Sequence, residues 1–355
     1  LRLGAKLGLR RLPTLKDVAE LAGVHPATVS RVLRGDGKLR VSAETRERIL
    51  TAAARLKYQP HSIGRSLKLR RSFTLALVLP DVGNPVFPEI IKGAERGVAE
   101  RGYSLVLVHL EPTGPGPREQ PYLRLVRQNR VDGLLLATAE LQDGFIQELA
   151  ELGVPFVLVN RRWGELPRYV IADDQAGAKL AVSHLVGLGH RQIAHLAGPL
   201  STDTARRRFE GYQEGLLVAG LPFQPELVEE CGYSWEGGVA GARRLLSRRP
   251  RPTAVFATNL LVAAGAMLVI REHGLQVPAD ISVVGFHDAP LAQVFNPPLT
   301  TVVFPLYRMG YEAARALVGL IEGERNEVRV VLPPDGLVVR ESTAPPPKEV
   351  VDARA

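Results

Sequence analysis

Residues 14–33, Thr14-Leu-Lys-Asp-Val-Ala-Glu-Leu-Ala-Gly-Val-His-Pro-Ala-Thr-Val-Ser-Arg-Val-Leu33, have the pattern of two short helices joined by a tight turn. Thr14 and Asp17 form a capping-box-like pair at the start of the first helix. Gly23 tolerates the positive φ that the turn needs. Pro26 stands where the second helix starts, and its missing N–H costs nothing there. The stretch therefore predicts a helix-turn-helix unit, with an ordinary helical hairpin of a globular domain as the alternative.

Apolar spacing extends this unit to a third helix, from Ser42 to about Leu56. The residues that we expect to form the small core are Val18, Ala19 and Leu21 of the first helix, Val29, Val32 and Leu33 of the second, and Ile49, Leu50, Ala53 and Leu56 of the third. Ala27, Thr28 and Arg31 are left facing outward on the second helix. Small residues at the start of such a helix suit contact with base edges in the major groove of DNA.

Charge is divided unevenly along the 355 residues. Residues 1–72 hold 17 Lys and Arg against 5 Asp and Glu, whereas residues 73–355 hold 28 against 32. A basic head on a mildly acidic body is typical of a DNA-binding module fused to a second domain. A basic membrane-surface helix is excluded because the basic residues are spread over several short helices without an exposed apolar stripe.

From Phe73 onward, short apolar strands alternate with amphipathic helices. We expect strands at 75–79, 104–108, 131–136, 156–159 and 169–171, and a second series at 192–196, 228–231, 254–257 and 281–285. This alternation predicts parallel sheets with helices on both faces. Two series predict two lobes with a cleft between them, and ligands of such sheets bind beyond the carboxyl ends of the strands.

The body carries no motif of a known enzyme class. It lacks a phosphate loop, a Gly-x-Ser-x-Gly elbow and a His-Glu-x-x-His pair. The glycine-rich stretch Gly237–Gly241 lies inside a helical pattern, which indicates close helix packing. His190 and His195 have no suitably spaced third ligand, and the single cysteine, Cys231, excludes an internal disulfide. We therefore expect no catalytic residues, no cofactor and no metal.

No apolar run reaches the length of a membrane span, and the first residues lack the pattern of a signal peptide. We expect a cytoplasmic protein with no membrane partner.

Between head and body, Pro60 can open a short helix that carries Ile63 and Leu67 on one side. Gly64 weakens this helix, so it could order only on contact with a partner. Leu67 would then be an apolar wedge for the DNA minor groove. The alternative is a plain interdomain linker.

The head and hinge resemble those of the LacI/GalR family of bacterial transcription regulators. The matching segments are Val18–Val24, Thr28–Leu33, Val41–Arg46, Leu56–Pro60 and Arg65–Leu67. In the body, the matching segments include Asn84-Pro85, Arg130–Leu134, Gly187–Arg191, Arg208–Tyr212, Val277–Phe286 and Leu299–Val302. The resemblance implies an all-α helix-turn-helix head plus an α/β two-lobed core of parallel sheets, like that of periplasmic sugar-binding proteins.

The organisation that follows has five parts. They are a disordered N-terminal extension (1–13), a helix-turn-helix DNA-binding domain (14–58), a hinge helix or linker (59–72), a two-lobed effector-binding and dimerisation domain (73–343) and a flexible tail (344–355).

The resemblance assigns the family's functional positions to individual residues of this sequence. The expected DNA-binding residues are Thr14, His25, Pro26, Ala27, Thr28, Ser30, Arg31, Arg65, Leu67 and Lys68. The head departs from the family at His25, where Ser usually caps the second helix, and at Gly64, where Ala is usual. Pro26 and Ala27 fall on the family's specificity positions, so contacts with thymine methyls and DNA shape should outweigh hydrogen bonds there.

The expected effector-binding residues are Phe87, Asn160, Thr204, Arg208, Tyr233, Asn259, His287 and Phe304. The resemblance makes Phe87 and Tyr233 aromatic contacts and Thr204, Arg208 and Asn259 polar ones. For Arg208, an interlobe ion pair is the alternative. Such a set suits a sugar's hydroxyls and apolar ring face.

Three of these positions depart from the family pattern. Asn160 and His287 each replace a common Asp, and Phe304 replaces a common Gln. An imidazole at residue 287 would titrate near neutral pH, so we expect effector binding to depend on pH.

These expectations combine into a dimeric allosteric repressor of a carbohydrate-utilisation operon. Its partners would be a near-palindromic double-stranded operator, a second copy of the chain and a sugar that releases the DNA. The alternatives are a co-repressor-dependent regulator with a purine- or nucleoside-type ligand and an enzyme with a DNA-binding head.

Leu67→Ala tests the minor-groove wedge. Loss of the apolar insertion should weaken operator binding by about tenfold or more, with effector binding unchanged. Leu7→Ala, in the N-terminal extension, is the control. Operator titration by fluorescence anisotropy decides, and equal loss of both binding activities, or of neither, would count against a wedge.

Overall fold

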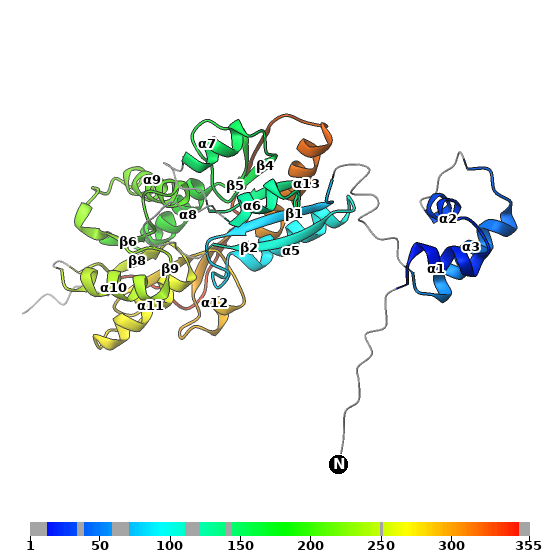
Figure 1. Cartoon of the computed structure of the whole chain (residues 1–355). Helices are drawn as coiled ribbons and strands as arrows, with labels where there is room; N and C mark the ends of the chain where they lie inside the picture. Colours follow the sequence, from blue (N-terminus) through cyan, green and yellow to red (C-terminus); the bar gives the residue numbers. More distant parts are fainter. Residues whose placement is uncertain are drawn as a thin grey trace, which may run out of the picture. The chain divides into compact units, whose positions relative to one another are not determined.

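The computed structural model describes residues 13–33, 39–58, 71–110, 121–138, 144–248 and 251–347. The chain divides into two compact units, residues 1–72 and residues 73–355 (Figure 1). The predicted hinge contacts Arg65, Leu67 and Lys68 lie outside the described residues.

The first unit is the predicted three-helix head. Its helices are α1 (Leu15–Ala22), α2 (Pro26–Leu33) and α3 (Ala43–Arg55). Val18, Val29 and Ile49 are fully buried where the three helices meet. Two of the predicted core residues are exposed instead, since Leu21 keeps 44% of its surface and Leu50 keeps 50%. Each lies about 100° around its helix from a buried neighbour, and Ala22 and Ala53 take the inward positions.

The second unit contains two six-stranded sheets. Figure 1 shows strands β1, β2, β4 and β5 in one group and β6, β8 and β9 in another. The first sheet has the order β11-β5-β4-β3-β1-β2 and is parallel throughout. Its strands are β1 (Thr74–Leu79), β2 (Ser104–His109), β3 (Gly133–Leu136), β4 (Phe156–Val159), β5 (Arg168–Ala172) and β11 (Val328–Leu332). Its helices are α5 (Phe87–Ala99), α6 (Pro121–Arg127), α7 (Gly144–Glu151) and α13 (Leu306–Glu322).

The second sheet has the order β12-β10-β9-β8-β6-β7, with only β12 antiparallel to its neighbour. Its strands are β6 (Ile193–Ala197), β7 (Val228–Glu230), β8 (Ala254–Ala257), β9 (Ser282–Phe286), β10 (Thr300–Val303) and β12 (Gly336–Val338). The helices of this lobe are α8 (Asp174–Gly187), α9 (Asp203–Val218), the 3₁₀ turn η1 (Pro225–Leu227), α10 (Trp235–Leu246), α11 (Leu260–Glu272) and α12 (Leu291–Val294).

The chain crosses between the two lobes three times. It leaves the first sheet after β5 and enters α8, which packs on β8, β9 and β10. It returns after β10 into α13, which packs on β3, β4 and β5. The last crossing joins β11 to β12. Because of these exchanges, neither lobe is complete without a segment from the other half of the sequence.

The predicted strands are all present, and their ends agree with the structure within two residues. Three strands were not predicted: β10, β11 and β12. β10 and β11 each precede a crossing between the lobes, and β12 follows one. The glycine-rich stretch in α10 is a close helix contact as predicted, since a Cβ on Gly238 would lie 2.6 Å from the Val262 carbonyl oxygen of α11.

The first residue of the predicted tail, Ala344, is hydrogen-bonded to the second lobe. Buried His190 places Nε2 2.8 Å from the Ala344 carbonyl oxygen, and the Ala344 N–H donates to Ser282. His195 lies in the core between the rings of Tyr212 and Phe256. Within the described ranges, no group of three or more His, Cys, Asp or Glu is placed to hold a metal ion, and no helix is long and apolar enough to cross a bilayer.

Helices α5 and α13 approach each other to backbone contact. A Cβ on Gly93 would lie 1.9 Å from the Tyr307 carbonyl oxygen, and one on Gly310 would lie 2.0 Å from that of Ile90. Because a backbone oxygen cannot move aside as a flexible side chain can, both positions require glycine.

Gly310→Ala should therefore lower the free energy of unfolding by about 2 kcal/mol. The matched control is Gly187→Ala, at an exposed helical position where a Cβ meets nothing within 4 Å. That change should leave the stability within about 0.5 kcal/mol or raise it slightly. Urea unfolding of both variants checks this, and equal stability of the two would contradict the close contact.

Candidate functional site

The start of helix α1 is fixed by a complete capping box. The Thr14 hydroxyl accepts a hydrogen bond from the Asp17 N–H, and the Thr14 N–H donates to the Asp17 carboxylate at 2.6 Å. Gly23 ends the helix with φ of 63°. Thr14 is thus engaged with the protein itself and sets where the first helix begins.

His25 takes over the capping role that Ser usually has at this position. Its Nδ1 accepts a hydrogen bond from the Ala27 N–H at 3.2 Å. This contact satisfies one of the free N–H groups of the first turn of α2. The departure at His25 therefore keeps a capped helix, with an exposed imidazole beside the predicted specificity positions.

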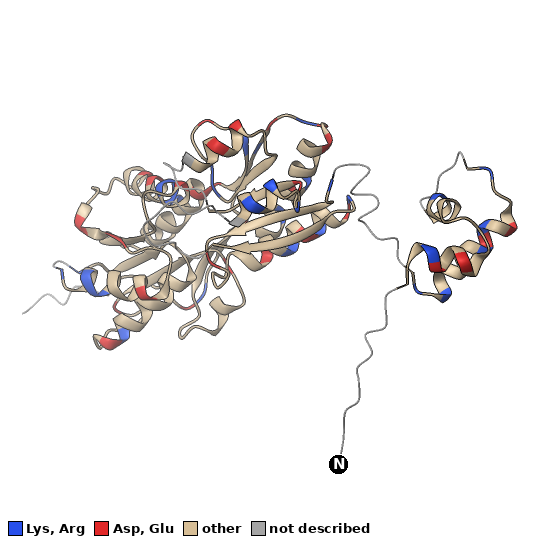
Figure 2. Cartoon of the chain, in the orientation of Figure 1, with Lys and Arg blue, Asp and Glu red and all other residues tan. Residues whose placement is uncertain are grey.

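The predicted contact residues of α2 lie along its outer side. Ala27 and Arg31 are exposed, and Pro26, Thr28 and Ser30 are half-buried. Figure 2 shows Lys and Arg on helices of the head. Lys16 of α1 and Arg48 of α3 are exposed. A helix that exposes a small residue and a cation, as α2 does with Ala27 and Arg31, suits contact with base edges and phosphates.

A pocket of about 220 Å³ lies at the carboxyl ends of strands from both lobes. Seven of the eight predicted effector residues line it, namely Phe87, Asn160, Thr204, Arg208, Tyr233, Asn259 and His287. The other lining residues are Pro80, Asp81, Asn84, Val86, Arg161 and Ser234. The topology thus brings together residues as far apart in sequence as Pro80 and His287, at the place where open parallel sheets bind ligands.

Phe304 does not line this pocket. Its ring packs behind the pocket wall, with its centroid 5.0 Å from that of Phe286 and 5.4 Å from that of His287. A Cβ on Gly177 of α8 would overlap this ring, so the glycine makes room for it. The prediction of a direct ligand contact is therefore corrected to a packing role. Sequence position alone does not tell the surface of a pocket from the layer beneath.

Arg208 of the pocket is fixed by contacts with three other residues. Its Nε lies 2.8 Å from Asp174, its Nη1 donates to the Thr258 carbonyl oxygen at 2.7 Å, and its Nη2 lies 2.8 Å from His287 Nε2. The guanidinium also lies over the Phe286 ring, 4.3 Å from its centroid. Arg208 lines the pocket as predicted. Its ion pair with Asp174 lies within the second lobe, because α8 and α9 both belong to that lobe, and so it is not the interlobe pair of the alternative.

A second buried arginine continues this network to the other lobe. Arg207 pairs with Asp174 at 2.6 Å and with Asp203 at 2.9 Å, and it donates to the carbonyl oxygens of Ala172 and Asn160. Asp203 in turn accepts from the N–H and the Nε of Arg162, which follows β4. Sequence reasoning missed this network, although the charged run at 203–208 was visible.

His287 is buried, with 4% of its surface exposed. Burial and the neighbouring Arg208 guanidinium lower the pKa of His287 well below its ordinary value. The side chain is therefore neutral near pH 7. The prediction that effector binding would depend on titration of this residue near neutral pH is wrong, because it assumed a solvated imidazole.

Tyr233 and Asn259 form a connected polar wall. The Tyr233 hydroxyl lies 2.8 Å from the hydroxyls of both Thr202 and Thr204. Asn259 caps α11 through the Val262 N–H, and its Nδ2 donates to the Tyr233 carbonyl oxygen. Both the oxygen and the nitrogen of the Asn259 amide are thus hydrogen-bonded within the protein, and the contact from Nδ2 positions Tyr233.

The pocket residues that were not predicted are mainly loop residues with local hydrogen bonds. Asp81 accepts from the Gly83 N–H and Asn84 from the Val86 N–H, which shapes the turn before α5. The Arg161 guanidinium lies 6.0 Å from the Tyr233 ring centroid. The Asn84-Pro85 and Asn160-Arg161 pairs could have identified Asn84 and Arg161.

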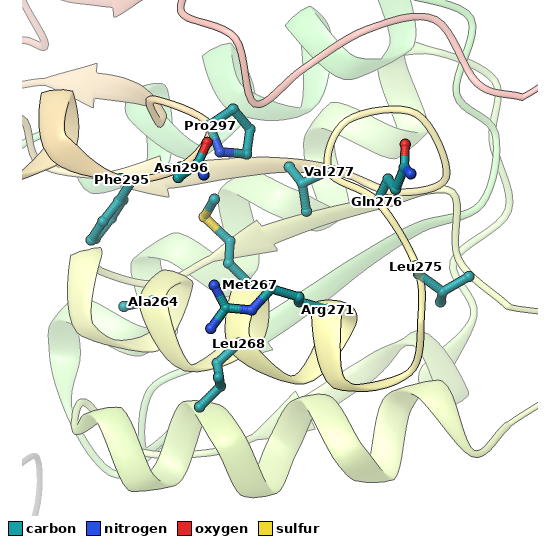
Figure 3. A pocket seen from close by; sticks show the side chains of 10 residues that line it. All are labelled: Ala264, Met267, Leu268, Arg271, Leu275, Gln276, Val277, Phe295, Asn296 and Pro297. Atoms are coloured by element: carbon teal, nitrogen blue, oxygen red, sulfur yellow. The ribbon is translucent and has the colours of Figure 1, made fainter.

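A larger cavity, of about 490 Å³, lies beside α11. Figure 3 shows Met267 between this helix and the Asn296-Pro297 turn, with Arg271 below it. The lining is mainly apolar and contains none of the predicted effector residues. Polar side chains converge in the smaller pocket, which is therefore the candidate ligand site.

Comparison with known proteins gives two matching families. Residues 14–61 match the lacI family of bacterial regulatory proteins, and residues 182–343 match a periplasmic binding protein-like domain. The chain is 40% identical over 343 residues to the HTH-type transcriptional regulator CelR of Thermobifida fusca, covering 94% of this chain and 99% of that protein.

Two solved structures are also similar. The transcriptional regulator CelR–cellobiose complex has a TM-score of 0.70 at 38% identity, covering 93% of this chain and 99% of that one. The lac repressor dimer bound to operator and the anti-inducer ONPF has a TM-score of 0.81 at 32% identity, covering 94% and 100%. The head, the two-sheet body and these similarities lead to one conclusion: the chain belongs to the lacI family of bacterial regulatory proteins, which are DNA-binding transcriptional regulators and not enzymes.

Proposed function

We propose that this regulator is a repressor of a carbohydrate-utilisation operon and that a sugar releases it from its operator. The observation that carries the proposal is the pocket that polar and aromatic side chains from both lobes line together. Guanidinium, amide and hydroxyl groups bind sugar hydroxyls, and the faces of Phe87 and Tyr233 suit an apolar ring face. Cellobiose is the first sugar to try, because a similar regulator is known in complex with it.

The proposed site consists of Phe87, Asn160, Thr204, Arg208, Tyr233 and His287, with Asn259 and Phe304 as supporting residues. A ligand there touches both lobes, so its binding depends on the angle between them. A ligand changes operator affinity only by its differential affinity for two such arrangements.

On the DNA side, the proposed contacts are His25, Pro26, Ala27, Thr28, Ser30 and Arg31 of the head and Arg65, Leu67 and Lys68 of the hinge. Two copies would place two heads in successive major grooves of a near-palindromic operator. A similar repressor is a dimer on its operator, and we propose the same assembly here. The protein would act in the cytoplasm.

Sequencing the genomic DNA fragments that the purified full chain retains without ligand tests this function. The proposal predicts a compact palindrome beside sugar transport or glycosidase genes. Added cellobiose should then lower the affinity for that palindrome. A ligand that strengthens operator binding would instead favour the co-repressor alternative, and diffuse salt-sensitive retention would contradict sequence-specific repression in the free state.

Arg208→Lys tests the pocket. Lysine keeps the charge but loses the planar set of donors that contacts Asp174, Thr258 and His287, so the sugar that releases the wild-type protein should bind about tenfold or more weakly. Operator affinity without sugar should stay within about threefold of wild type, because Asp174 keeps its ion pair with Arg207. Calorimetry measures the sugar affinity, and operator titration measures the operator affinity.

Arg206→Lys is the matched control, since Arg206 is an exposed neighbour on α9 that does not line the pocket. It should behave as wild type. A retained sugar response in Arg208→Lys would remove Arg208 from the proposed site.

A further inference from the structure

Two pocket residues share an unusual backbone position. Asn160 follows β4 with φ of 64°, and His287 follows β9 with φ of 67°. β4 and β9 each occupy the third position in their sheet. Left-handed backbone is uncommon for residues other than glycine and concentrates at functional sites. The fold thus turns one polar side chain from each lobe into the same pocket.

The contact with Arg208 determines which nitrogen of His287 carries hydrogen. A guanidinium has only donors, and Arg208 Nη2 lies 2.8 Å from His287 Nε2. Nε2 must therefore offer a lone pair. An imidazolium has no lone pair to offer, so the ring is neutral and its hydrogen is on Nδ1.

The Nδ1–H has no acceptor within the described part of the chain. The atom is buried and has no hydrogen-bond partner there. The rings of Phe286 and Phe304 pack against the imidazole and offer no oxygen. The Asn160 Oδ1, across the pocket lining, is likewise buried without a partner. A buried donor without a partner is costly, which favours a ligand that supplies one.

We propose that His287 donates a hydrogen bond from Nδ1 to the effector, so that the effector presents an accepting oxygen at this point of the pocket. The inference rests on the proposed function of the pocket and deepens it. The oxygen is a hydroxyl or ether oxygen of a sugar or the carboxylate of a sugar acid, since each of these accepts hydrogen bonds. A carboxylate side chain at position 287 would instead require a ligand group that donates. His287 therefore accepts ligands with a carboxylate or an ether oxygen at this point, which a carboxylate side chain would not.

The ring state can be measured without knowing the effector. Long-range ¹H–¹⁵N correlation spectra of the full chain, with the signals of His287 identified by their loss in His287→Asn, report the protonation of each nitrogen. We expect a protonated Nδ1 and an unprotonated Nε2, unchanged between about pH 6 and pH 8. A hydrogen on Nε2, or an imidazolium at pH 7, would overturn the inference.

The donor role is tested by exchanging His287 for Asn and for Asp. Both residues tolerate positive φ, so neither strains the backbone. Asn can accept from Arg208 through Oδ1 and donate into the pocket through Nδ2, whereas ionised Asp only accepts. The two variants differ in donor capacity and charge and hardly at all in size.

The probes are cellobiose, which carries ether oxygens, and cellobionate, in which a carboxylate replaces the reducing-end aldehyde. Calorimetry should show that His287→Asn binds the preferred probe within about threefold of wild type and that His287→Asp binds it at least about tenfold more weakly. Preference of the wild-type protein for cellobionate would identify a carboxylate as the acceptor, and preference for cellobiose an uncharged hydroxyl or ether oxygen. Equal or tighter binding by His287→Asp would overturn the proposal.

Failure of the two proposals can be told apart. If the wild-type protein binds neither probe, these sugars fail as effectors, and the spectra still decide whether His287 presents a donor. If the wild-type protein binds a probe and the spectra show the other tautomer, the sugar function stands and the donor role of His287 fails.

Discussion

The carboxylate of Asp174 lies between two buried arginines, and the architecture of the candidate ligand pocket depends on this contact. Oδ1 faces Arg208 and Oδ2 faces Arg207, at 2.8 and 2.6 Å. Asp174 has no exposed surface. Removing one partner of such a buried pair typically costs about 3–5 kcal/mol, because the remaining charge is left without compensation. The first crossing between lobes places Asp174 here, at the start of α8.

From this carboxylate, contacts extend to both lobes. In the first lobe, Arg207 donates hydrogen bonds to the carbonyl oxygens of Asn160, which follows β4, and Ala172, which ends β5. Asp203 at the start of α9 accepts a hydrogen bond from the N–H of Arg162. Arg208 fixes the tautomer of His287 at the end of β9. The polar groups of the pocket are therefore oriented before a ligand arrives, which lowers the cost of binding. The same contacts make the pocket sensitive to the angle between the lobes.

Local rules were enough to predict the head. The capping pair Thr14 and Asp17, the turn glycine Gly23 and the first-turn Pro26 are all found in the predicted roles. Leu50 was misplaced because adjacent apolar residues on a helix cannot all face inward. In the body every predicted strand is present, β4 and β5 included, although neither is followed by a helix of its own sheet. The missed strands β10, β11 and β12 lie where the chain exchanges between sheets.

The sequence predicted which residues line the pocket better than it predicted their burial and their contacts. Residue types and the family resemblance identified seven pocket residues, since strand ends of parallel sheets converge. The burial of His287, the placement of Phe304 in the layer beneath and the Asp174–Arg207–Asp203 network depend on packing between segments far apart in sequence. A single sequence does not carry that information in any local pattern.

The central claim is that the buried network of Asp174, Arg207, Arg208 and Asp203 couples ligand binding in the pocket to the arrangement of the two lobes. The most direct test is the coupling between sugar and operator in Asp203→Asn, in which the amide weakens the contacts to Arg162 and Arg207. The ratio of operator dissociation constants with and without the releasing sugar should shrink by about tenfold or more, while the folded variant still binds each partner alone. A ratio equal to that of the wild-type protein would contradict the account.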